Sequence, residues 1–370
     1  MLSFWEKNSL INYDSIIIGA GITGLSVACE LKERNPQMNI LVLERGILPS
    51  GASTKNAGFA CIGSLSENLH DISVMGEEAL VNLVKNRHQG LQLLRNRLGD
   101  EAIGYIGSGG YELILKDQDD TFLNKMEYMN NLLFPYFLKN IFSLCNYKIN
   151  SFGFSTKSVK AMILNSEEGQ IDTGKMIHSL WNYCQKIGVK IITGALVSSI
   201  HETENKIEVL ANEIEFKSSQ LFICTNAFTK TLLPNIELTP GRGQVIATKP
   251  IQNLKLNGSY FFDDGFFYFK NFENRIIFGG GRNLQFEEER TTEFGSNQFI
   301  LDKLNYYLKT LIIPNQEYEI DHSWSGIMAF SENKLPLVKK ISERQFLGVR
   351  LNGMGVALGS KIAKDLVDLA

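Results

Sequence analysis

The first fifty residues contain short apolar runs separated by a helical pattern. Residues 15–18 (SIII) form a β-branched run, which indicates a buried parallel strand. Apolar positions at helical spacing follow and stop at Asn35-Pro36. A second apolar run, residues 40–43 (ILVL), comes next. The pattern therefore predicts one strand–helix–strand unit of about thirty residues, the size of a βαβ motif.

Beyond residue 45 the periodicity predicts helices and strands in alternation. Helical spacing covers residues 73–98, 121–137, 173–186 and 296–311, and a last helix follows residues 352–360. Strands are predicted at residues 105–115, 189–193, 196–201, 206–210, 213–217 and 220–224. Residues 260–272 (YFFDDGFFYFKNF) predict an aromatic hairpin that turns at Asp263-Asp264-Gly265. Since no Pro/Gly/Ser-rich linker divides the chain, we expect two interleaved domains.

Three glycines occupy the turn between the first strand and the first helix, in the sequence GAGITG. Gly19 permits a tight turn, Gly21 lets the backbone approach a pyrophosphate, and Gly24 lets helix and strand pack closely. The start of the helix offers N–H groups to phosphates. Glu44 lies 20 residues after Gly24, where a carboxylate accepts hydrogen bonds from a ribose 2′-hydroxyl. The turn therefore predicts an adenine dinucleotide site.

Composition narrows the classes of function. The chain has 37 basic and 40 acidic residues, a net charge of −3, and no basic excess points to nucleic acid. Its apolar stretches fall short of the ~18 residues that suggest a membrane span, and no signal-peptide core is visible. Leu2, Phe4 and Trp5 are expected to form a short arm that packs on the domain. Five scattered cysteines and five histidines without metal-ligand spacing predict free thiols, a reducing cytoplasm and no structural metal.

The segment after Glu44 distinguishes a flavin from a nicotinamide cofactor. Residues 47–63 (ILPSGASTKNAGFACIG) place hydroxyls and an amide where the chain passes the pyrophosphate and a flat ring. Ser53, Thr54 and Asn56 are candidate donors to phosphate or ring oxygens. Ala57 lets the backbone come near the ring. For these residues taken alone, a plain loop is the alternative interpretation.

Eight segments together resemble the glycine/D-amino acid oxidase family of flavoproteins, which includes the sarcosine oxidases. They are GAGITG, Glu44-Arg45, GASTKNAG, EGQIDTGKMIHSL, CTNAFT, PGRGQV, HSWSGIM and NGMGVALGS. The resemblance implies an α/β fold, in which a Rossmann-like FAD-binding domain is interleaved with an antiparallel-sheet α+β substrate domain. We expect residues 1–75, 165–240 and 335–370 in the FAD-binding domain, and residues 76–164 and 241–334 in the substrate domain.

The resemblance also implies FAD as the cofactor, bound by residues from distant parts of the chain. In the family, the helix that follows NGMGVALGS points its N-terminus at the flavin, which suits the negative charge gained on reduction. Val197 matches the position whose backbone meets the adenine, and Thr225 matches a turn near the pyrophosphate. The candidate cofactor-binding residues are Gly19, Gly21, Ile22, Thr23, Gly24, Glu44, Arg45, Ser53, Thr54, Asn56, Ala57, Val197, Thr225, Gly353, Met354 and Gly355.

Two sequence positions bear on how the flavin is attached. Some relatives link it covalently through a histidine in the segment that is STKNAG here, or through a cysteine near WSGIM. Neither residue type stands in those segments. We therefore expect non-covalent FAD.

The family's chemistry oxidises the C–N bond of an amino acid or small amine by hydride transfer to flavin N5, and oxygen or an electron carrier then takes the electrons. An amino acid carboxylate needs a cation, and relatives often have Arg where this chain has Met328. Arg282 is the candidate clamp, with a structural salt bridge as its alternative; Arg242 is expected to be a hinge contact. Tyr268 is a candidate hydroxyl donor. His322 is a candidate for tuning amine protonation, with a structural histidine as its alternative.

Three functions remain open at this point. The leading hypothesis is an FAD-dependent oxidoreductase acting on an amino acid or small amine. One alternative is a flavoenzyme acting on a modified tRNA base, against which the net charge of −3 argues. The other alternative is a non-catalytic flavin-binding module. The sequence names neither the substrate nor the electron acceptor.

Overall fold

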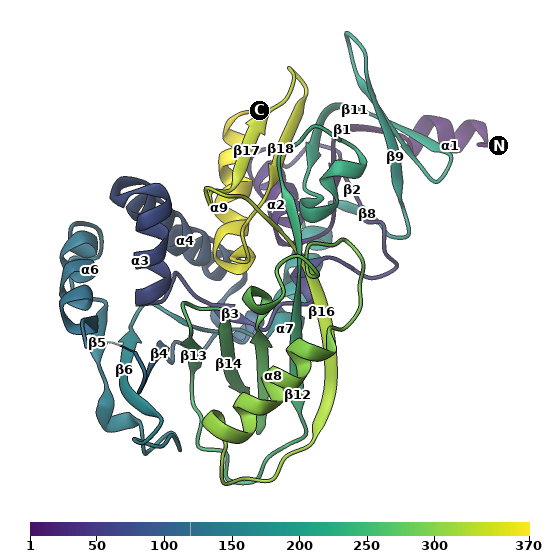
Figure 1. Cartoon of the computed structure of the whole chain (residues 1–370). Coiled ribbons are helices and arrows are strands. Elements are labelled where there is room, and N and C mark those ends of the chain that lie inside the picture. Colours follow the sequence, from purple (N-terminus) through teal and green to yellow (C-terminus); the bar gives the residue numbers. More distant parts are fainter. Residues whose placement is uncertain (119) are drawn as a thin grey trace.

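The protein, shown as a computed structural model in Figure 1, is built around two large sheets with helices beside them. The structure describes residues 1–118 and 120–370. Within these residues the strands form two eight-stranded sheets and one two-stranded sheet, in which β3 (Phe59–Ala60) pairs with β7 (Gly169–Gln170).

The first sheet has the strand order β17-β18-β11-β1-β2-β8, and β10 and β9 extend it from β11. β1 (Asn12–Ile18) pairs in parallel with β2 (Ile40–Leu43) and with β11 (Ile214–Ile223). The other strands are β8 (Lys190–Ile192), β9 (Val197–Glu202), β10 (Ile207–Ala211), β17 (Leu337–Lys340) and β18 (Gln345–Val349). Both faces of β1 are covered, which explains its unbroken apolar run.

Helices cover one face of the first sheet. α2 (Ile22–Arg34), α7 (Thr173–Lys186) and α9 (Gly355–Asp368) pack there with alternate residues of β1, β2, β11 and β18. The β9–β10 hairpin and the short helix η3 (Asn226–Thr231) lie on the opposite face. α7 begins where the sequence predicted, because the Asp172 carboxylate accepts the N–H of Lys175.

The second sheet has the strand order β16-β12-β15-β14-β13-β4-β6-β5, and β13 and β4 are its parallel pair. Its strands are β4 (Gly110–Leu115), β5 (Phe142–Leu144), β6 (Val159–Asn165), β12 (Thr239–Thr248), β13 (Ser259–Phe262), β14 (Phe267–Phe272), β15 (Arg275–Gly280) and β16 (Ile320–Phe330). The predicted aromatic hairpin is confirmed, since β13 pairs with β14 and Asp263, Asp264 and Gly265 turn with positive φ.

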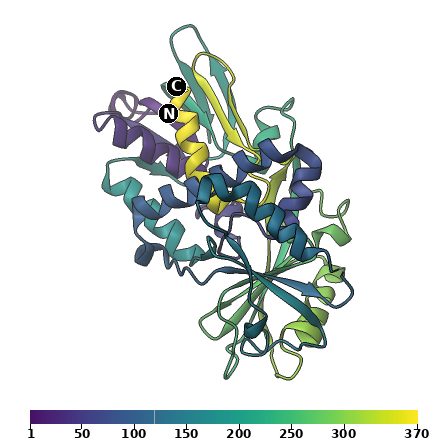
Figure 2. The same cartoon turned by 90° about the vertical axis from the view of Figure 1, so that its left-hand side faces the viewer.

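A group of helices joins the two sheets. α3 (Leu65–Met75), α4 (Glu77–Leu98) and α6 (Phe122–Phe137) lie beside them, as Figure 2 shows. Leu80 and Val84 of α4 pack with strands of the second sheet, whereas Leu91 and Leu94 pack with α2 and α9. The remaining elements are α5 (Asp100–Ile103), η1 (Ala52–Thr54), η2 (Asn146–Lys148), η4 (Arg282–Leu284), α8 (Gln298–Tyr307) and η5 (Leu308–Ile312). The domain boundaries stay a prediction, since α4 contributes to both cores.

Several local expectations need correction. The N-terminal helix α1 (Phe4–Ser9) projects from the molecule in Figure 1, and Phe4 and Trp5 are 70% and 73% exposed, so the expected packing of this arm is wrong. The two strands predicted at residues 213–217 and 220–224 are one continuous strand, β11 (Ile214–Ile223), because the buried Ser218 keeps its place in the ladder with β1 and β10. The strand predicted from residue 105 begins at Gly110.

Candidate functional site

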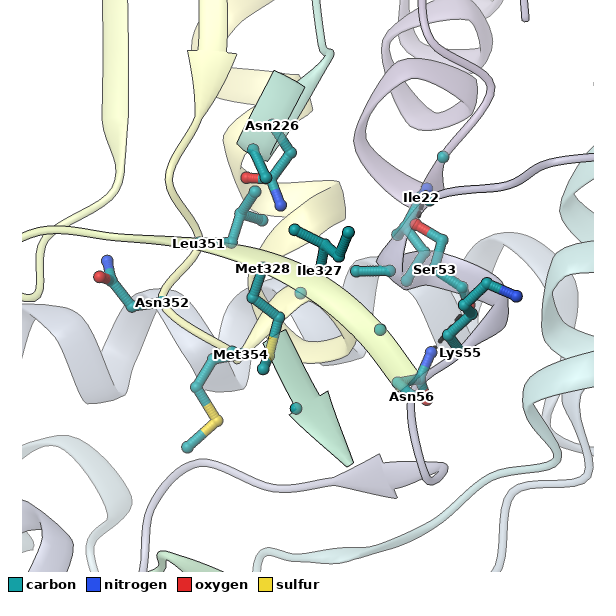
Figure 3. Close-up of a pocket in the computed structure, with 18 of the residues that line it drawn as sticks. Ile22, Ser53, Lys55, Asn56, Asn226, Ile327, Met328, Leu351, Asn352 and Met354 are labelled. Carbon is teal, nitrogen blue, oxygen red and sulfur yellow. Dashed lines mark hydrogen bonds between the residues drawn. The ribbon is translucent and has the colours of Figure 1, made fainter. Parts of the chain in front are cut away.

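A cavity of about 750 Å³ lies between the two sheets. It is lined by the glycine turn at the start of α2, the loop after β2, the start of α9, and strands β12 to β16 of the second sheet. Figure 3 shows part of its wall, with Ile22 and Ser53 close together and Met328 and Met354 on another side. Long-range folding thus brings most of the predicted site residues to one space.

The glycine turn leaves no room for side chains. Gly19 has φ +104°, and a Cβ there would lie 2.8 Å from the Cys224 carbonyl oxygen. A Cβ on Gly24 would lie 1.9 Å from the Gly19 carbonyl oxygen. The Ile22 N–H donates to Ser53 Oγ at 3.0 Å, which leaves the Ser53 hydroxyl proton free to point toward the cavity. This is the close backbone approach that a pyrophosphate needs.

Glu44 occupies the place that the sequence spacing predicted, at the end of β2 and on the cavity wall. Its buried carboxylate accepts the N–H groups of Ala20 and Gly46, both at 3.0 Å, so it also holds the glycine turn against the next loop. Arg45 lies with its guanidinium 3.5 Å from the centre of the Phe228 ring. Together with Val197 these residues form the end of the cavity suited to an adenosine.

The loop between residues 53 and 58 is shaped by its own polar side chains. The Asn56 amide donates to the Ser53 carbonyl at 2.8 Å and accepts the Gly58 N–H at 2.9 Å. Asn56 therefore lines the cavity, while one N–H and the oxygen of its amide fix the loop. The Thr54 hydroxyl donates to the Pro49 carbonyl at 2.8 Å, and Thr54 is absent from the cavity wall. We remove Thr54 from the candidate donors to the cofactor.

Two helix N-termini meet at this cavity. α2 begins at Ile22 behind the glycine turn, and α9 begins at Gly355 behind Gly353 and Met354. Neither helix has an acidic residue in its first turn, so the partial positive charge of each N-terminus is not neutralised there. A ligand with a pyrophosphate at one end and a ring that gains negative charge at the other fits this arrangement.

Tyr268 and Arg282 lie on the part of the cavity wall formed by the second sheet. The Tyr268 ring meets Phe59 edge-on at 5.4 Å, and burial raises the pKa of its hydroxyl to about 12, so it stays a donor at neutral pH. The Arg282 guanidinium lies 3.9 Å from the Phe330 ring centre and 4.7 Å from that of Phe286. Burial lowers the pKa of Arg282 from its usual range, which still leaves it cationic.

Arg242 and Arg282 differ in their partners. Arg242 donates to both carboxylate oxygens of the fully buried Glu289, at 2.9 and 3.0 Å, so its guanidinium is held in an ion pair, and its role as a hinge contact stays a prediction. In residues 1–118 and 120–370, by contrast, no ion pair and no side-chain hydrogen bond involves Arg282. A cation held by two aromatic rings at a cavity wall is available to an anionic ligand.

His322 does not belong to this site. It lies near the outer end of β16 with 73% of its side chain exposed, and it is absent from the cavity wall. The register between β12 and β16 shifts between Ala247 and Thr248 of β12, next to the pair Ala247–His322. We therefore withdraw His322 as a candidate for tuning the substrate amine.

The sequence analysis missed a charged group on the cavity wall. Glu67 and His70 of α3, Arg87 of α4 and Lys334 of the β16–β17 loop all line the cavity. Nη2 of Arg87 lies 3.6 Å from a carboxylate oxygen of Glu67 and 3.5 Å from a carboxylate oxygen of the fully buried Asp71. These residues come from segments up to 267 positions apart, and no local motif connects them.

The fold and the cavity define a flavoprotein site of the dinucleotide-binding type. The family model for the DAO family, FAD-dependent oxidoreductases, matches residues 14–369, so the chain belongs to this family. It is an FAD-dependent oxidoreductase, and the predicted fold class and cofactor are confirmed.

Relatives and solved structures agree with this assignment. The chain is 24% identical over 362 residues to the probable oxidoreductase OrdL of Haemophilus influenzae, covering 93% of this chain and 80% of that protein. It is 22% identical to a D-amino acid dehydrogenase of Helicobacter pylori, covering 96% and 94%. The structure of L-proline dehydrogenase from P. horikoshii matches with a TM-score of 0.80 at 17% identity, covering 97% and 93%. Glycine oxidase from Geobacillus kaustophilus matches with a TM-score of 0.77 at 18% identity, covering 97% and 94%. At such identities, these structures show a shared fold.

Two further observations concern the described part of the chain alone. It contains no helix that combines the length and the apolar character needed to cross a membrane. It also contains no group of three or more His, Cys, Asp or Glu side chains arranged to hold a metal ion.

Proposed function

We propose that this protein oxidises the C–N bond of an amino acid at its bound FAD, and that Arg282 holds the substrate carboxylate. The observation that carries the proposal is the Arg282 guanidinium on the cavity wall, with aromatic neighbours and without an acidic partner in the described residues. A carboxylate that leaves water needs such a partner. Relatives named as a D-amino acid dehydrogenase and a glycine oxidase support an amino acid substrate.

The side chains around this cation supply the remaining contacts. Tyr268 has its hydroxyl near Arg282, whose charge acts to lower the pKa that burial raises. This hydroxyl is a second donor for the substrate carboxylate. Phe59 and Phe261 pack with ring centres 5.3 Å apart beside Tyr268 and exclude water from the reacting carbon. When bound, FAD supplies N5 as the acceptor of the hydride that leaves the carbon bearing the amine.

A panel of L- and D-amino acids and of simple amines tests this function. The FAD-loaded protein is mixed anaerobically with each compound, and loss of the oxidised-flavin absorbance is followed over time. We expect faster loss with an amino acid than with the amine that lacks only its carboxylate. Loss with amines alone would remove the carboxylate role of Arg282, and no loss with any compound would favour a non-catalytic module. Admitting oxygen or a quinone afterwards identifies the electron acceptor.

A further inference from the structure

One buried lysine is not explained by the proposed contacts with substrate. Lys270 lies on β14, two residues after Tyr268 and therefore on the same face of the strand. It is 3% exposed, although lysine is rarely buried without a partner. Its Nζ donates to the carbonyl oxygens of Ile171 at 2.6 Å and Gly58 at 3.1 Å.

Neither of these partners is a carboxylate. Asp172 is the acidic residue whose charge acts on Lys270, and its carboxylate already accepts the Lys175 N–H that caps α7. Burial lowers the pKa of Lys270 to about 8, so the ammonium form predominates at neutral pH. The protein thus keeps a positive charge in its interior, and two backbone carbonyl oxygens accept its hydrogen bonds.

The contacts of Lys270 are made with the loop that forms the cofactor side of the cavity. Gly58 has φ +79°, and a Cβ there would lie 2.5 Å from Lys270 Nζ, so glycine and lysine fit each other. The neighbours of Gly58 in the chain, Ala57 and Phe59, both line the cavity. Lys270 therefore fixes this segment from behind while the segment faces the cavity.

We propose that Lys270 is a positioning residue that holds residues 57–59 against the flavin ring and adds positive charge at that side of the cofactor. The inference rests on the proposed function, which places the ring beside these residues. With FAD bound, the N-terminus of α9 would stabilise the negative charge of the reduced ring with partial charges, and Lys270 would add a full charge from the second sheet. Its effect on the cofactor is independent of which substrate the enzyme uses.

Sulfite binding to the FAD-loaded protein measures this charge without turnover. Sulfite adds through sulfur to flavin N5, and the displaced electron pair becomes negative charge on the ring, which a nearby cation stabilises. We expect Lys270→Met to raise the sulfite Kd about tenfold, the order of magnitude for loss of one charge in a protein-like dielectric. The flavin midpoint potential should fall in the same variant. Lys270→Arg should restore part of the sulfite affinity, which a purely structural role would not require.

A control variant and a pH titration complete the test. Lys249→Met removes a lysine whose side chain is 54% exposed and paired with Glu319, and it should leave the sulfite Kd unchanged. The Lys270 ammonium is present below a pH of about 8 and lost above it, so the difference between wild type and Lys270→Met should vanish at alkaline pH. If the variant does not fold, a wild-type affinity that follows only the titration of sulfite itself overturns the inference.

The outcomes separate the two proposals. Bound FAD with equal sulfite affinity in wild type and Lys270→Met overturns the role of Lys270 and leaves the proposed function intact. A tenfold loss in a protein that oxidises no amino acid supports Lys270 and overturns the substrate assignment. A protein that binds no FAD overturns both.

Discussion

At the scale of single residues, the availability of Arg282 to an anionic ligand depends on the hydrogen bonds that the carboxylate of Glu289 accepts from other residues. Glu289 is fully buried and accepts hydrogen bonds from Arg242, Gln244 and Asn297. The arginine and the two amides use both carboxylate oxygens of Glu289, and the pKa of Glu289 stays below its usual range because these donors outweigh its burial. The charge of Glu289 still acts on Arg282, although no ion pair joins the two residues. The cavity wall therefore keeps a cation with which no carboxylate of the described residues forms an ion pair.

Replacing Arg282 by methionine tests this argument with two substrates. A hydrogen bond to a charged group contributes about 1.5–3 kcal/mol, so Arg282→Met should lower kcat/KM for an amino acid by roughly ten- to hundredfold. An amine without a carboxylate should lose far less, because it does not use the guanidinium. Steady-state kinetics with both substrates, and the FAD content of the variant, provide the measurement. Equal losses for both substrates would make Arg282 structural.

A relocated guanidinium serves as the matched control for this variant. Met328 of β16 lies opposite Gly241 of β12 in the sheet register. A Cβ on Gly241 would lie 3.3 Å from Nη1 of Arg282, so the Arg282 guanidinium reaches the same place from η4, the short helix after β15. Met328→Arg in the Arg282→Met background should therefore recover part of the amino acid activity. No recovery, with FAD still bound, would count against carboxylate recognition at this point of the wall.

Glu44 is the second residue whose role is testable alone. Glu44→Arg removes the acceptor for the ribose hydroxyls and places a cation against the N–H groups of Ala20 and Gly46, so we expect a higher Kd for FAD. Glu44→Gln keeps one oxygen acceptor and should lose less. Equilibrium titration of apoprotein with FAD gives both constants. FAD affinity equal to wild type in Glu44→Arg would mean that the carboxylate does not face the cofactor.

At the scale of elements, local pattern was informative wherever neighbours in sequence determine the conformation. The strand–helix–strand unit, the start of α7 at Asp172 and the aromatic hairpin were predicted, because capping, turn chemistry and periodicity act within a few residues. The helix predicted at residues 296–311 is present as α8 followed directly by the π-helix η5, and only this change from α- to π-helical winding after Tyr307 was not predicted. The wall formed by Glu67, Arg87 and Lys334 had no local signal, because tertiary packing alone brings α3, α4 and the β16–β17 loop together.

The close contact between the end of β1 and α2 requires that residue 24 has no Cβ. A Cβ on Gly24 would lie 1.9 Å from a backbone oxygen, which cannot move without distorting the glycine turn. We expect Gly24→Ala to lower the free energy of unfolding by about 1–3 kcal/mol, as overpacking does, and to weaken FAD binding. Gly107→Ala is the control, because its Cβ would meet Tyr105 at an ordinary 3.5 Å. Denaturant unfolding of both variants tests this, and equal stability of the two would refute the packing role.

At the scale of the whole molecule, the site exists only where the two sheets meet. The first sheet and its helices supply the glycine turn, Glu44 and the start of α9, whereas Tyr268 comes from β14 of the second sheet and Arg282 from η4 after β15. α4 connects the cores of both parts. Because a ligand that binds the folded state alone adds stability, FAD at a hundred times its Kd should raise the free energy of unfolding by about 2.7 kcal/mol.

The burial of the cysteines on the cavity wall bears on whether the flavin is attached covalently. Cys61 lies on the cavity wall with its sulfur 3.5 Å from that of Met354. A thiol attacks a ring only as thiolate, and burial, with Glu168 and Glu67 nearby, raises the pKa of Cys61 well above its usual range. Burial also raises the pKa of Cys224, the second thiol on the wall, to about 12. The raised pKa values keep both thiols protonated at neutral pH, and non-covalent FAD stays a prediction.

Acid precipitation of the yellow protein tests this expectation directly. We expect FAD in the supernatant, identified by its mass, and a colourless pellet of unmodified polypeptide. Cys61→Ser should release the same amount of FAD, because the thiol makes no bond to it. Colour that remains with the pellet in wild type and disappears in Cys61→Ser would instead place a covalent bond at Cys61. Colour that remains in both would place the bond at another residue, and either result would contradict the non-covalent assignment.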